Sequence, residues 1–582
     1  MENIEKIRHS LSHLMTMAIL EVYPKAGLGV GPTIENGFYQ DYDLPKNFSP
    51  DVLPKIEQRI KELIKEDIKF ERHDMTFAKA LAFYKKDKYK TELIKDLKKK
   101  SGKKISFYKS GKFDNLCAGP HVKSAKEINP SAFKLTKVAG AYWKGNEKNK
   151  MLTRIYGVAF NNETELQNFL KMQEEAEKRD HRILGQKLDL FVFSDIIGKG
   201  LPLFTEKGAA IRRELEKLAL EEEIKRGYKH VITPDLAKVD LYKKSGHYPY
   251  YKDTMYHVMK IDEEELILRP MTCPHHYQIY LAKPRSYREL PFRIAELAKQ
   301  FRYEKSGELT GLVRVRSFCL ADAHIIVQPE KVEEEMNRVL DLIDYMANVF
   351  GLKPNIDYRY RLSLGDRKDT KKYYKDDKAW NFAENILKKV LKERNAPFFE
   401  AEKEAAFYGP KIDVQMKDVS GKENTAFTVQ YDFVGPKRFN LVYTDKDGKE
   451  KEAIVIHRSS IGCVERIMAF LIEKYAGNFP VWLSPVQVAV MPISEKHDDY
   501  AKEVAKKLQE AGVRLEIKNE NETLGKKIRE AEMQKIPYLL IIGDKEVQAK
   551  TVAVRERTKG DSGILNINDF LVKISGDIKN KK

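Results

Sequence analysis

Cysteine is scarce in this chain. It occurs four times among 582 residues, at widely separated positions: Cys117, Cys273, Cys319 and Cys463. So few thiols, placed so far apart, exclude the disulfide framework that stabilises small secreted domains. The count fits a reducing compartment, in which each thiol is free for chemistry.

Long apolar runs are missing as well. No stretch approaches the roughly 18 apolar residues that a membrane-spanning helix needs, and residues 1–5 lack the charged and then apolar pattern of a signal peptide. We therefore expect no membrane association and a cytoplasmic location. A Gly-x-x-x-x-Gly-Lys-Ser/Thr loop is also missing, which disfavours a P-loop mechanism of phosphate binding. At this length the chain should form about three or four domains.

Positive charge is in excess. Lysine and arginine outnumber aspartate and glutamate by 105 − 87 = +18, which favours a polyanionic partner such as RNA. A lysine-rich proteome would give the same excess. Residues 85–104, with ten lysines and three acids, illustrate the ambiguity, because they could face RNA or form a solvated surface.

Apolar periodicity outlines the elements. It predicts helices over residues 4–22 and 208–226, the second ending at Gly227, and a further helix that begins at Ser49-Pro50. Alternation predicts strands over residues 231–234, 407–413, 428–433 and 453–457, with a turn near Gly421. From Pro485 onward a β-α-β-α-β pattern predicts a largely parallel sheet.

The region from Arg269 to His324 concentrates thiol, imidazole, carboxylate and guanidinium groups. Arg302, Arg314 and Arg316 could clamp a phosphate or a carboxylate through paired hydrogen bonds. On its own, the segment 302–316 equally predicts a charged hairpin that turns at residues 306–308.

Two sets of residues could bind a metal. Cys273 and His324 could ligate zinc, but fifty residues separate them, so a buried thiol and a core histidine remain the alternative. His9 and His13 share one helix face, but Ser10 stands where a His-Glu-x-x-His protease has its general base. Two solvated histidines are the alternative there.

Four segments in one order resemble a known family. They are Arg-Pro-Met-x-Cys-Pro at 269–274, Phe-Arg-Tyr-Glu-x-Ser-Gly at 301–307, Gly-Leu-x-Arg-Val-Arg-x-Phe at 311–318 and Asp-Ala-His at 322–324. Together they resemble the motif 2 region of class II aminoacyl-tRNA synthetases, in particular the bacterial-type threonyl-tRNA synthetase family. The resemblance runs from about residue 1 to the C-terminus.

The resemblance implies a multidomain α+β and α/β fold. We expect an N-terminal α+β editing domain at 1–162, a connector helix at 163–183, a class II antiparallel-sheet catalytic domain at 184–483 and a C-terminal α/β anticodon-binding domain at 484–582. The helix at 208–226 with the strand after it resembles motif 1 and implies a homodimer, and residues 461–466 resemble motif 3. Relatives commonly begin with a ubiquitin-like domain, whereas this chain starts at the editing domain.

The resemblance also implies an activity and its residues. It predicts a ligase that activates L-threonine with ATP and Mg²⁺ and transfers it to tRNA(Thr), the alternative being an aminoacylation-deficient RNA-binding paralogue. It implies that Arg302 and Arg466 are catalytic and that they bind ATP together with Glu304 and Arg314. It also implies that one Zn²⁺ per subunit is ligated by Cys273, His324 and His457. The substrate would be bound by Asp322, Tyr408, Lys411 and Gln430.

Two substitutions affect the threonine pocket. Leu320 and Thr425 stand where the family usually has glutamine. They predict weakened threonine affinity or a repacked pocket.

Selecting threonine requires a second site. The implied zinc ion would have open coordination for the hydroxyl of threonine, which valine lacks, so valine would be rejected. Serine keeps the hydroxyl and lacks only a methyl group, and the binding free energies of the two amino acids would differ by only roughly 1–3 kcal/mol. The pattern His-x-x-x-His followed by Cys-x-Gly-Pro-His resembles the family's editing domain. It implies that Ser-tRNA(Thr) is hydrolysed by five residues: His9, His13, Lys90, Cys117 and His121.

Two further departures concern the editing and anticodon domains. Asn115 and Gln40 stand where the editing domain usually has an acid and a tyrosine, which predicts less efficient editing. In the C-terminal domain, Glu546 and Arg555 match the positions that read anticodon bases, where such side chains bond base edges.

Overall fold

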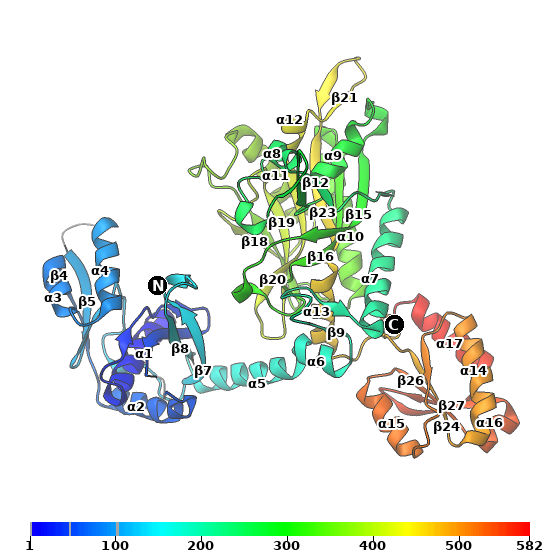
Figure 1. Cartoon of the computed structure of the whole chain (residues 1–582), viewed down its shortest axis with the longest axis horizontal. Helices are drawn as coiled ribbons and strands as arrows, with labels where there is room; N and C mark the ends of the chain where they lie inside the picture. The colour runs from blue at the N-terminus through cyan, green and yellow to red at the C-terminus, as the bar shows by residue number, and fades with distance from the viewer. Residues whose placement is uncertain (1–2, 46–47, 101–103) are drawn as a thin grey trace. The chain divides into compact units, whose positions relative to one another are not determined.

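The computed structural model describes residues 3–45, 48–100 and 104–582, and it divides into two compact units, Met1–Glu174 and Glu175–Lys582 (Figure 1). Each unit contains a hydrophobic core of its own. Within the described residues, no helix combines the length and the apolar character that crossing a membrane requires.

The first unit is built on helix α1 (Asn3–Val22), as predicted. Its apolar stripe is buried at Leu11, Leu14, Met15, Ala18 and Ile19. The stripe packs against a sheet in which β3 (Gly37–Asp43) lies next to β8 (Met151–Ala159), and β8 lies next to β7 (Phe133–Tyr142). The short strands β1 (Gly27–Leu28) and β2 (Thr33–Ile34) both pair with β3.

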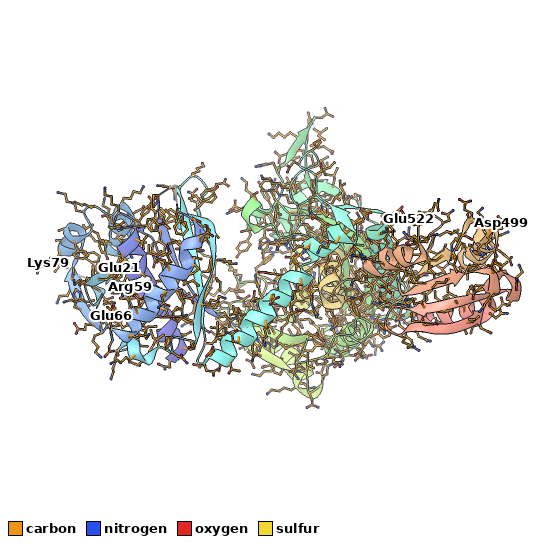
Figure 2. All side chains as sticks on the ribbon, turned by 90° about the horizontal axis from the view of Figure 1, so that it is seen from below. Glu21, Arg59, Glu66, Lys79, Asp499 and Glu522 are labelled. Atoms are coloured by element: carbon orange, nitrogen blue, oxygen red, sulfur yellow. The ribbon has the colours of Figure 1, made fainter. Side chains whose placement is uncertain are left out.

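Helix α2 (Leu53–Lys65) packs beside α1. The predicted start at Ser49-Pro50 is slightly early, because these residues form a 3-10 turn, Pro50–Val52, in which the Ser49 side chain accepts the Asp51 N–H. On the outer face, Arg59 of α2 donates to Glu21 of α1 and to Glu66, each at 2.7 Å (Figure 2). This ion cluster ties the two helices together at the surface.

A second small sheet completes this unit. It consists of β4 (Phe70–Thr76), β5 (Lys104–Ser110) and β6 (Phe113–Leu116), covered by α3 (Phe77–Phe83) and α4 (Lys88–Lys100). Cys117 follows directly after β6, and this sheet therefore carries the thiol toward α1.

The connector expected at 163–183 is two helices, not one. Helix α5 spans Glu163–Arg179 and helix α6 spans His181–Lys187. Asp180 separates them because its carboxylate accepts the Arg182 N–H at 2.8 Å and so caps the second helix. The His181 imidazole then bonds Glu473 at 2.7 Å and accepts the Leu312 N–H at 3.1 Å.

The second unit is organised around an eight-stranded sheet. Its order is β11 (Lys229–His230), β15 (Phe292–Phe301), β16 (Ser317–Val327), β23 (Ile454–Cys463), β20 (Glu423–Asp432), β19 (Lys411–Lys417), β17 (Tyr358–Ser363) and β18 (Phe398–Ala401). All central pairs are antiparallel, which confirms the antiparallel core. In the register, His324 lies opposite His457, and His457 lies opposite Gln430.

Helices cover this sheet. The predicted helix over 208–226 is confirmed as α7 (Glu206–Lys225), and Gly227 follows it with a left-handed φ of 83°. Helices α10 (Val332–Val349), α11 (Asp377–Glu393) and α13 (Val464–Tyr475) contribute buried residues to the same core.

The strand predicted over 231–234 is wrong. Strand pairing ends after His230, and only the Val231 N–H still reaches the Ala295 carbonyl, at 2.9 Å. The Thr233 N–H instead donates to the Glu296 carboxylate, and Pro234 has no N–H to offer a neighbouring strand. A side chain has thus replaced the neighbouring strand as hydrogen-bond partner.

The strands predicted after residue 407 are confirmed with a shift. β19 begins at Lys411, not at Phe407, because Pro410 cannot donate to a ladder, and β20 runs from Glu423 to Asp432. Gly421 makes the turn between them with a φ of 81°, as predicted.

The C-terminal sheet has the order β25 (Leu515–Ile517), β24 (Val488–Pro492), β26 (Tyr538–Ile542), β27 (Thr551–Glu556) and β28 (Gly560–Asn566). The first three strands are parallel, but β27 and β28 are antiparallel, so a largely parallel sheet is wrong. A parallel crossover takes roughly a dozen residues, whereas the short helix α16 (Asp544–Ala549) alone joins β26 to β27. The other helices are α14 (Asp498–Glu510), α15 (Leu524–Met533) and α17 (Ile567–Lys579).

Candidate functional site

A cavity of about 720 Å³ opens over the eight-stranded sheet. It gathers all of the residues predicted for metal, ATP and substrate: Cys273, Arg302, Glu304, Arg314, Asp322, His324, Tyr408, Lys411, Gln430, His457 and Arg466. Strands β16, β19, β20 and β23 supply five of these side chains, and the rest come from loops and from the first turns of two helices.

Three of these residues form a compact donor cluster. Cys273 begins helix α9 (Cys273–Leu281), while His324 and His457 come from β16 and β23, where they are cross-strand partners. Their ligand atoms lie within 4.8 Å of one another, and all three residues are buried. One sulfur and two imidazole nitrogens at this spacing suit zinc.

Burial favours the neutral forms of the thiol and of one imidazole in this cluster. Burial raises the pKa of the Cys273 thiol well above its ordinary value, and the nearby Asp322 and Asp432 carboxylates raise it further. Burial also lowers the pKa of His324 well below its ordinary value, so its imidazole is neutral. A neutral imidazole is ready to ligate, and a divalent cation would reverse the shift at the thiol.

Arg302 and Arg466, the two candidates for binding phosphate, each contact other parts of the protein that fix their position. Arg302 lies with its guanidinium 5.1 Å from the centre of the Phe318 ring. Arg466 donates to the carbonyls of Val313, at 3.1 Å, and Thr425, at 2.8 Å. The two like charges repel each other across the cavity, so an anion between them is stabilised.

Glu304 and Arg314 bind each other in this structure. The Arg314 Nε–H donates to the Glu304 carboxylate at 2.8 Å, and Glu308 lies 3.2 Å from the same guanidinium. Both side chains line the cavity. Their use in binding ATP therefore requires this pair to open, and the exposure of the Arg314 side chain keeps that cost small.

The residues predicted to bind the substrate belong to a set of linked polar groups. Tyr408 donates a hydrogen bond to the Gln430 amide oxygen, and Gln300 donates to Asp322 at 3.2 Å. Burial raises the pKa of Asp322. Lys411 pairs with Asp413 at 3.0 Å.

The two departures from glutamine lie at the cavity wall. Leu320 lines it from β16, and the Thr425 hydroxyl accepts a hydrogen bond from Gln415 at 2.7 Å. Thr425 thus has a partner within the protein, and weakened threonine affinity or a repacked pocket remains a prediction.

His247 lines the same cavity and was missed from the sequence. It follows helix α8 (Val239–Ser245), its Nδ1 lies 2.8 Å from the Ser245 hydroxyl, and its ring contacts Tyr408. Burial and, to a lesser extent, the nearby His457 lower its pKa to about 3. A neutral, buried imidazole that faces the pocket can accept a hydrogen bond from a bound ligand. A lone histidine in a loop gives no periodic signal by which to find it.

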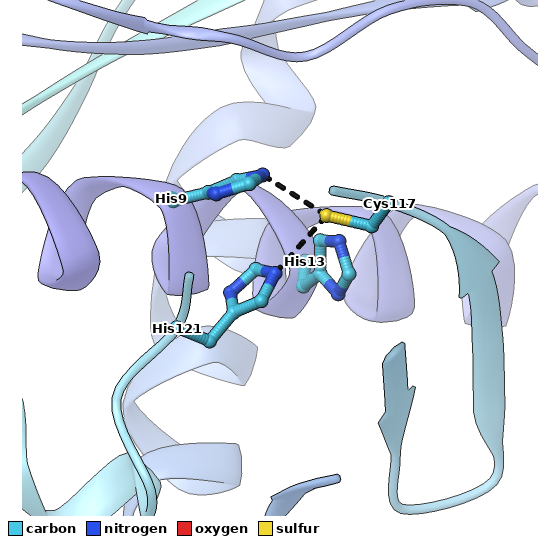
Figure 3. Close-up of side chains that lie close together, drawn as sticks. All are labelled: His9, His13, Cys117 and His121. Atoms are coloured by element: carbon cyan, nitrogen blue, oxygen red, sulfur yellow. Dashed lines mark hydrogen bonds between the residues drawn. The ribbon is translucent and has the colours of Figure 1, made fainter. Parts of the chain in front are cut away.

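A second cluster lies in the first unit (Figure 3). His9 and His13 project from α1, and the Cys117 sulfur lies 3.2 Å from the Nε2 atoms of both His9 and His121. The four ligand atoms fall within 4.8 Å, so the cluster could also hold a metal. His13 is only 3% exposed, and the alternative of two solvated histidines is wrong for it.

Hydroxyl groups orient this cluster. The Ser10 hydroxyl lies 3.1 Å from Nδ1 of His121, and the Ser110 hydroxyl lies 3.3 Å from Nδ1 of His13. Lys90 is buried nearby, and desolvation lowers its pKa to about 8. Burial raises the pKa of the Cys117 thiol above its ordinary value, and the nearby Lys90 charge only partly offsets that rise.

The two unusual residues of this unit have other partners. The Asn115 amide oxygen accepts the hydrogen bond of the Tyr84 hydroxyl at 3.0 Å. Gln40 is buried and donates to the Asp41 carbonyl at 3.2 Å. Both side chains therefore serve the local packing.

We expect the first unit to lose stability in acid. Burial lowers the pKa of His121 to about 2 and that of His13 well below its ordinary value. Unfolded chains protonate these imidazoles below about pH 6.5, so each histidine should cost about 1.4 kcal/mol per pH unit below that point, and nothing above it. Hydrogen exchange of α1 peptides in the full-length protein, followed at increasing urea concentration at about pH 7 and about pH 5, measures the loss. The urea concentration at which these peptides lose protection should be lower at the acidic pH, and equal values at the two pH conditions would contradict the prediction.

The residues predicted to read the anticodon have other partners here. Glu546 is 9% exposed, and its carboxylate accepts the Gly543 N–H at 2.9 Å, which caps α16. Arg555 lies on β27 and donates to Glu532 at 3.3 Å. Base reading by either residue remains a prediction, and for Glu546 it requires the cap to open.

Three family models match the chain. They are the tRNA synthetase class II core domain (G, H, P, S and T) at residues 256–475, the anticodon binding domain at residues 487–576, and the threonyl and alanyl tRNA synthetase second additional domain at residues 105–156.

Curated relatives and solved structures match as well. The threonine–tRNA ligase of Geobacillus kaustophilus is 47% identical over 584 residues, which cover 100% of this chain and 88% of the relative. That of Clostridium botulinum is 48% identical over 583 residues, covering 100% of this chain and 90% of the relative. The structure of the RNA binding domain of threonyl-tRNA synthetase from Cryptosporidium parvum has a TM-score of 0.65 at 36% identity, covering 68% of this chain and 98% of that one.

Proposed function

The chain belongs to the threonine–tRNA ligase family of class II aminoacyl-tRNA synthetases, and from this premise we propose how its own residues carry out the reaction. It activates L-threonine with ATP and Mg²⁺ and transfers the threonyl group to tRNA(Thr). One observation carries the assignment of residues: a single cavity joins a metal donor cluster to paired arginines. An RNA-binding paralogue without aminoacylation would need neither.

Activation joins two anions. The carboxylate of threonine attacks the α-phosphate of ATP, pyrophosphate leaves, and negative charge builds on the phosphate during the step. Arg302 and Arg466 provide fixed positive charge at this point, since neither has to reorganise when the charge develops. Glu304 and Arg314 release each other, and they then contact the adenine end and the phosphates of ATP.

Threonine is selected by the cluster of Cys273, His324 and His457, whose donor set fits one zinc ion per chain. Bound there, zinc would offer open coordination to the amino and hydroxyl groups of threonine, which valine cannot supply. Asp322 accepts a hydrogen bond from the substrate hydroxyl. Tyr408, Lys411 and Gln430 provide the remaining polar contacts.

Serine that escapes this selection is removed by hydrolysis in the first unit. Water attacks the ester carbonyl of Ser-tRNA(Thr), and the ester C–O bond breaks to give serine and free tRNA. The imidazoles of His9, His13 and His121 are neutral, so they can accept hydrogen bonds from that water and hold it for attack, with Cys117 beside them. Lys90, largely protonated near neutral pH, can donate to the developing oxyanion.

We expect His121→Ala to slow hydrolysis of Ser-tRNA(Thr) by about 100-fold, the usual loss when a reactant is no longer held in position. Threonine activation should stay unchanged, because the adenylation residues lie in the other unit. His73→Ala is the control, since His73 lies on β4 and pairs with Asp114. Deacylation by His121→Ala at the parent rate would contradict this assignment of the editing site.

The proposal also covers tRNA binding, the oligomeric state and the location of the protein. The C-terminal sheet and helices bind the anticodon of tRNA(Thr), with Glu546 and Arg555 as candidates for base contact. The chain forms a homodimer through α7 and the segment after it, a proposal supported by the 95% exposure of the apolar Ile232. It works in the cytoplasm, where its four free cysteines remain reduced.

ATP–pyrophosphate exchange tests the proposal as a whole. Zinc-loaded protein should catalyse exchange with threonine, weakly with serine and not with valine, and a chelator that removes zinc should abolish it. Zinc restored to the chelated protein should recover the activity. A loaded protein that gives no exchange with any of the three amino acids would contradict the enzymatic assignment.

A further inference from the structure

We propose that His276, held by Glu296, is a positioning residue that fixes the imidazole of His324 in the one tautomer able to ligate a metal. The inference rests on the proposed zinc site, but it concerns residues for which no role has been assigned. It is carried by a chain of hydrogen bonds that runs behind the donor cluster, on the side away from the cavity.

Three buried side chains form that chain. Nδ1 of His276 lies 2.8 Å from Nδ1 of His324, and Nε2 of His276 lies 3.2 Å from Oε2 of Glu296. The two rings meet edge to face, with centroids 4.8 Å apart. His276 is 0% exposed, His324 1% and Glu296 3%, so water cannot substitute for any of these partners.

Glu296 is restricted to accepting hydrogen bonds. Its Oε1 receives the Arg269 guanidinium at 3.0 Å and the Thr233 N–H at 3.2 Å, and its Oε2 receives the Thr233 hydroxyl at 2.7 Å. Arg269 also donates to the Thr233 oxygen at 2.6 Å, which leaves the hydroxyl hydrogen for Glu296. The carboxylate therefore stays ionised and has no proton to donate.

The donor and the acceptor of each hydrogen bond in the chain follow from the Glu296 carboxylate, which can only accept. An acceptor at Glu296 requires an N–H on Nε2 of His276, and because a neutral imidazole carries only one N–H, its Nδ1 is then without a proton. That nitrogen accepts the Nδ1–H of His324, so Nε2 of His324 carries a free lone pair. The opposite tautomer of His324 would carry a hydrogen on Nε2 and could not ligate through it.

The second imidazole of the cluster is fixed in the complementary way. Nε2 of His457 lies 2.9 Å from Asp432 and 3.3 Å from the Tyr277 hydroxyl, so its Nδ1 is left for a metal. Each histidine thus has one nitrogen engaged by a buried acidic partner, directly or through His276. This agreement between the two ligands is what a metal site needs and what an ordinary packed core does not.

Glu296→Gln and His276→Ala test the inference in the full-length protein. Glutamine keeps the shape of Glu296 but can donate its amide N–H to His276, which favours the non-ligating tautomer of His324. Both variants should bind zinc about 10- to 100-fold more weakly, as is usual when an outer hydrogen-bond partner is lost. Competition with a chromophoric chelator measures the affinity, and the absorption spectrum of the Co²⁺-loaded protein reports on the ligand set.

Two further variants separate positioning from general damage. His276→Gln keeps a hydrogen-bond acceptor near His324 and should recover part of the affinity. Glu335→Gln is the matched control: this glutamate is also buried, at 2% exposure, and it pairs with Arg293 at 2.7 Å away from the cluster. It should bind zinc like the parent, and circular dichroism should show every variant folded.

The outcomes can be told apart. A parent that binds zinc, with Glu296→Gln and His276→Ala binding it within about twofold of the parent, would overturn the role of His276 and leave the zinc site intact. Weakening by Glu335→Gln to the same extent would also overturn it, because the loss would then reflect any buried charge. A parent that binds no zinc at all would overturn both the inference and the proposed site.

Discussion

Replacing Arg302 with alanine will slow threonine-dependent ATP–pyrophosphate exchange by about 100- to 1000-fold, the cost of removing one preorganised charge-stabilising group. The loss should appear in kcat, because the negative charge that Arg302 offsets is greatest in the transition state. Arg302→Lys should recover only part of the rate, since a lysine ammonium lacks the planar fork that pairs with two phosphate oxygens.

The control for this experiment is Arg288→Ala. Arg288 lies on the surface, where its guanidinium donates to the Tyr287 hydroxyl at 3.2 Å, so exchange should be unchanged. An Arg302→Ala variant that retains more than about a tenth of the parental kcat would contradict the assignment. The remaining candidate for the dominant charge would then be Arg466.

Replacing Cys273 with alanine will remove zinc and most of the preference for threonine over valine. A site that engages the substrate hydroxyl rejects an analogue without it by roughly 10⁴- to 10⁵-fold, whereas an apolar pocket separates isosteres by only about 100-fold. The ratio of kcat/KM for the two amino acids should therefore fall by about 100- to 1000-fold. Metal analysis and exchange kinetics on the same preparation measure both effects.

Cys319→Ala is the matched control for that variant. Cys319 is also a buried thiol of the same unit, 5% exposed, but it lies outside the donor cluster. It should keep one zinc per chain and full discrimination. Discrimination that survives in Cys273→Ala would show that the hydroxyl is read by Asp322 and its neighbours instead.

The elements were largely predictable from the sequence, because apolar periodicity reports which face of a helix is buried. Helices α1 and α7 lie where their stripes of leucine and isoleucine indicated. The errors fall where a side chain replaces a backbone partner. Asp180 splits the connector by capping α6, and Glu296 takes the Thr233 N–H that a strand would have used. Periodicity carries no information about such contacts.

The candidate site was predictable only through resemblance. Spacing alone could not connect Cys273 to His324, because their proximity depends on a helix start and a strand that meet through the tertiary fold. His247 and His276 were missed for a related reason. His247 stands alone in its loop, and although His276 follows His275 and Cys273, their spacing does not show what its ring contacts. Their roles appear only when the fold places His457 beside the first and Glu296 beside the second.

The placement of His324 directly opposite His457 has a consequence for how the chain reaches its native state. Successive side chains of a strand point to opposite faces of a sheet, so a slip of one residue between β16 and β23 would turn one imidazole away from the other. Only a correctly aligned pair could then share an ion with Cys273. A bound metal would therefore stabilise chains whose central strands are in register, and misaligned chains would lack that stabilisation.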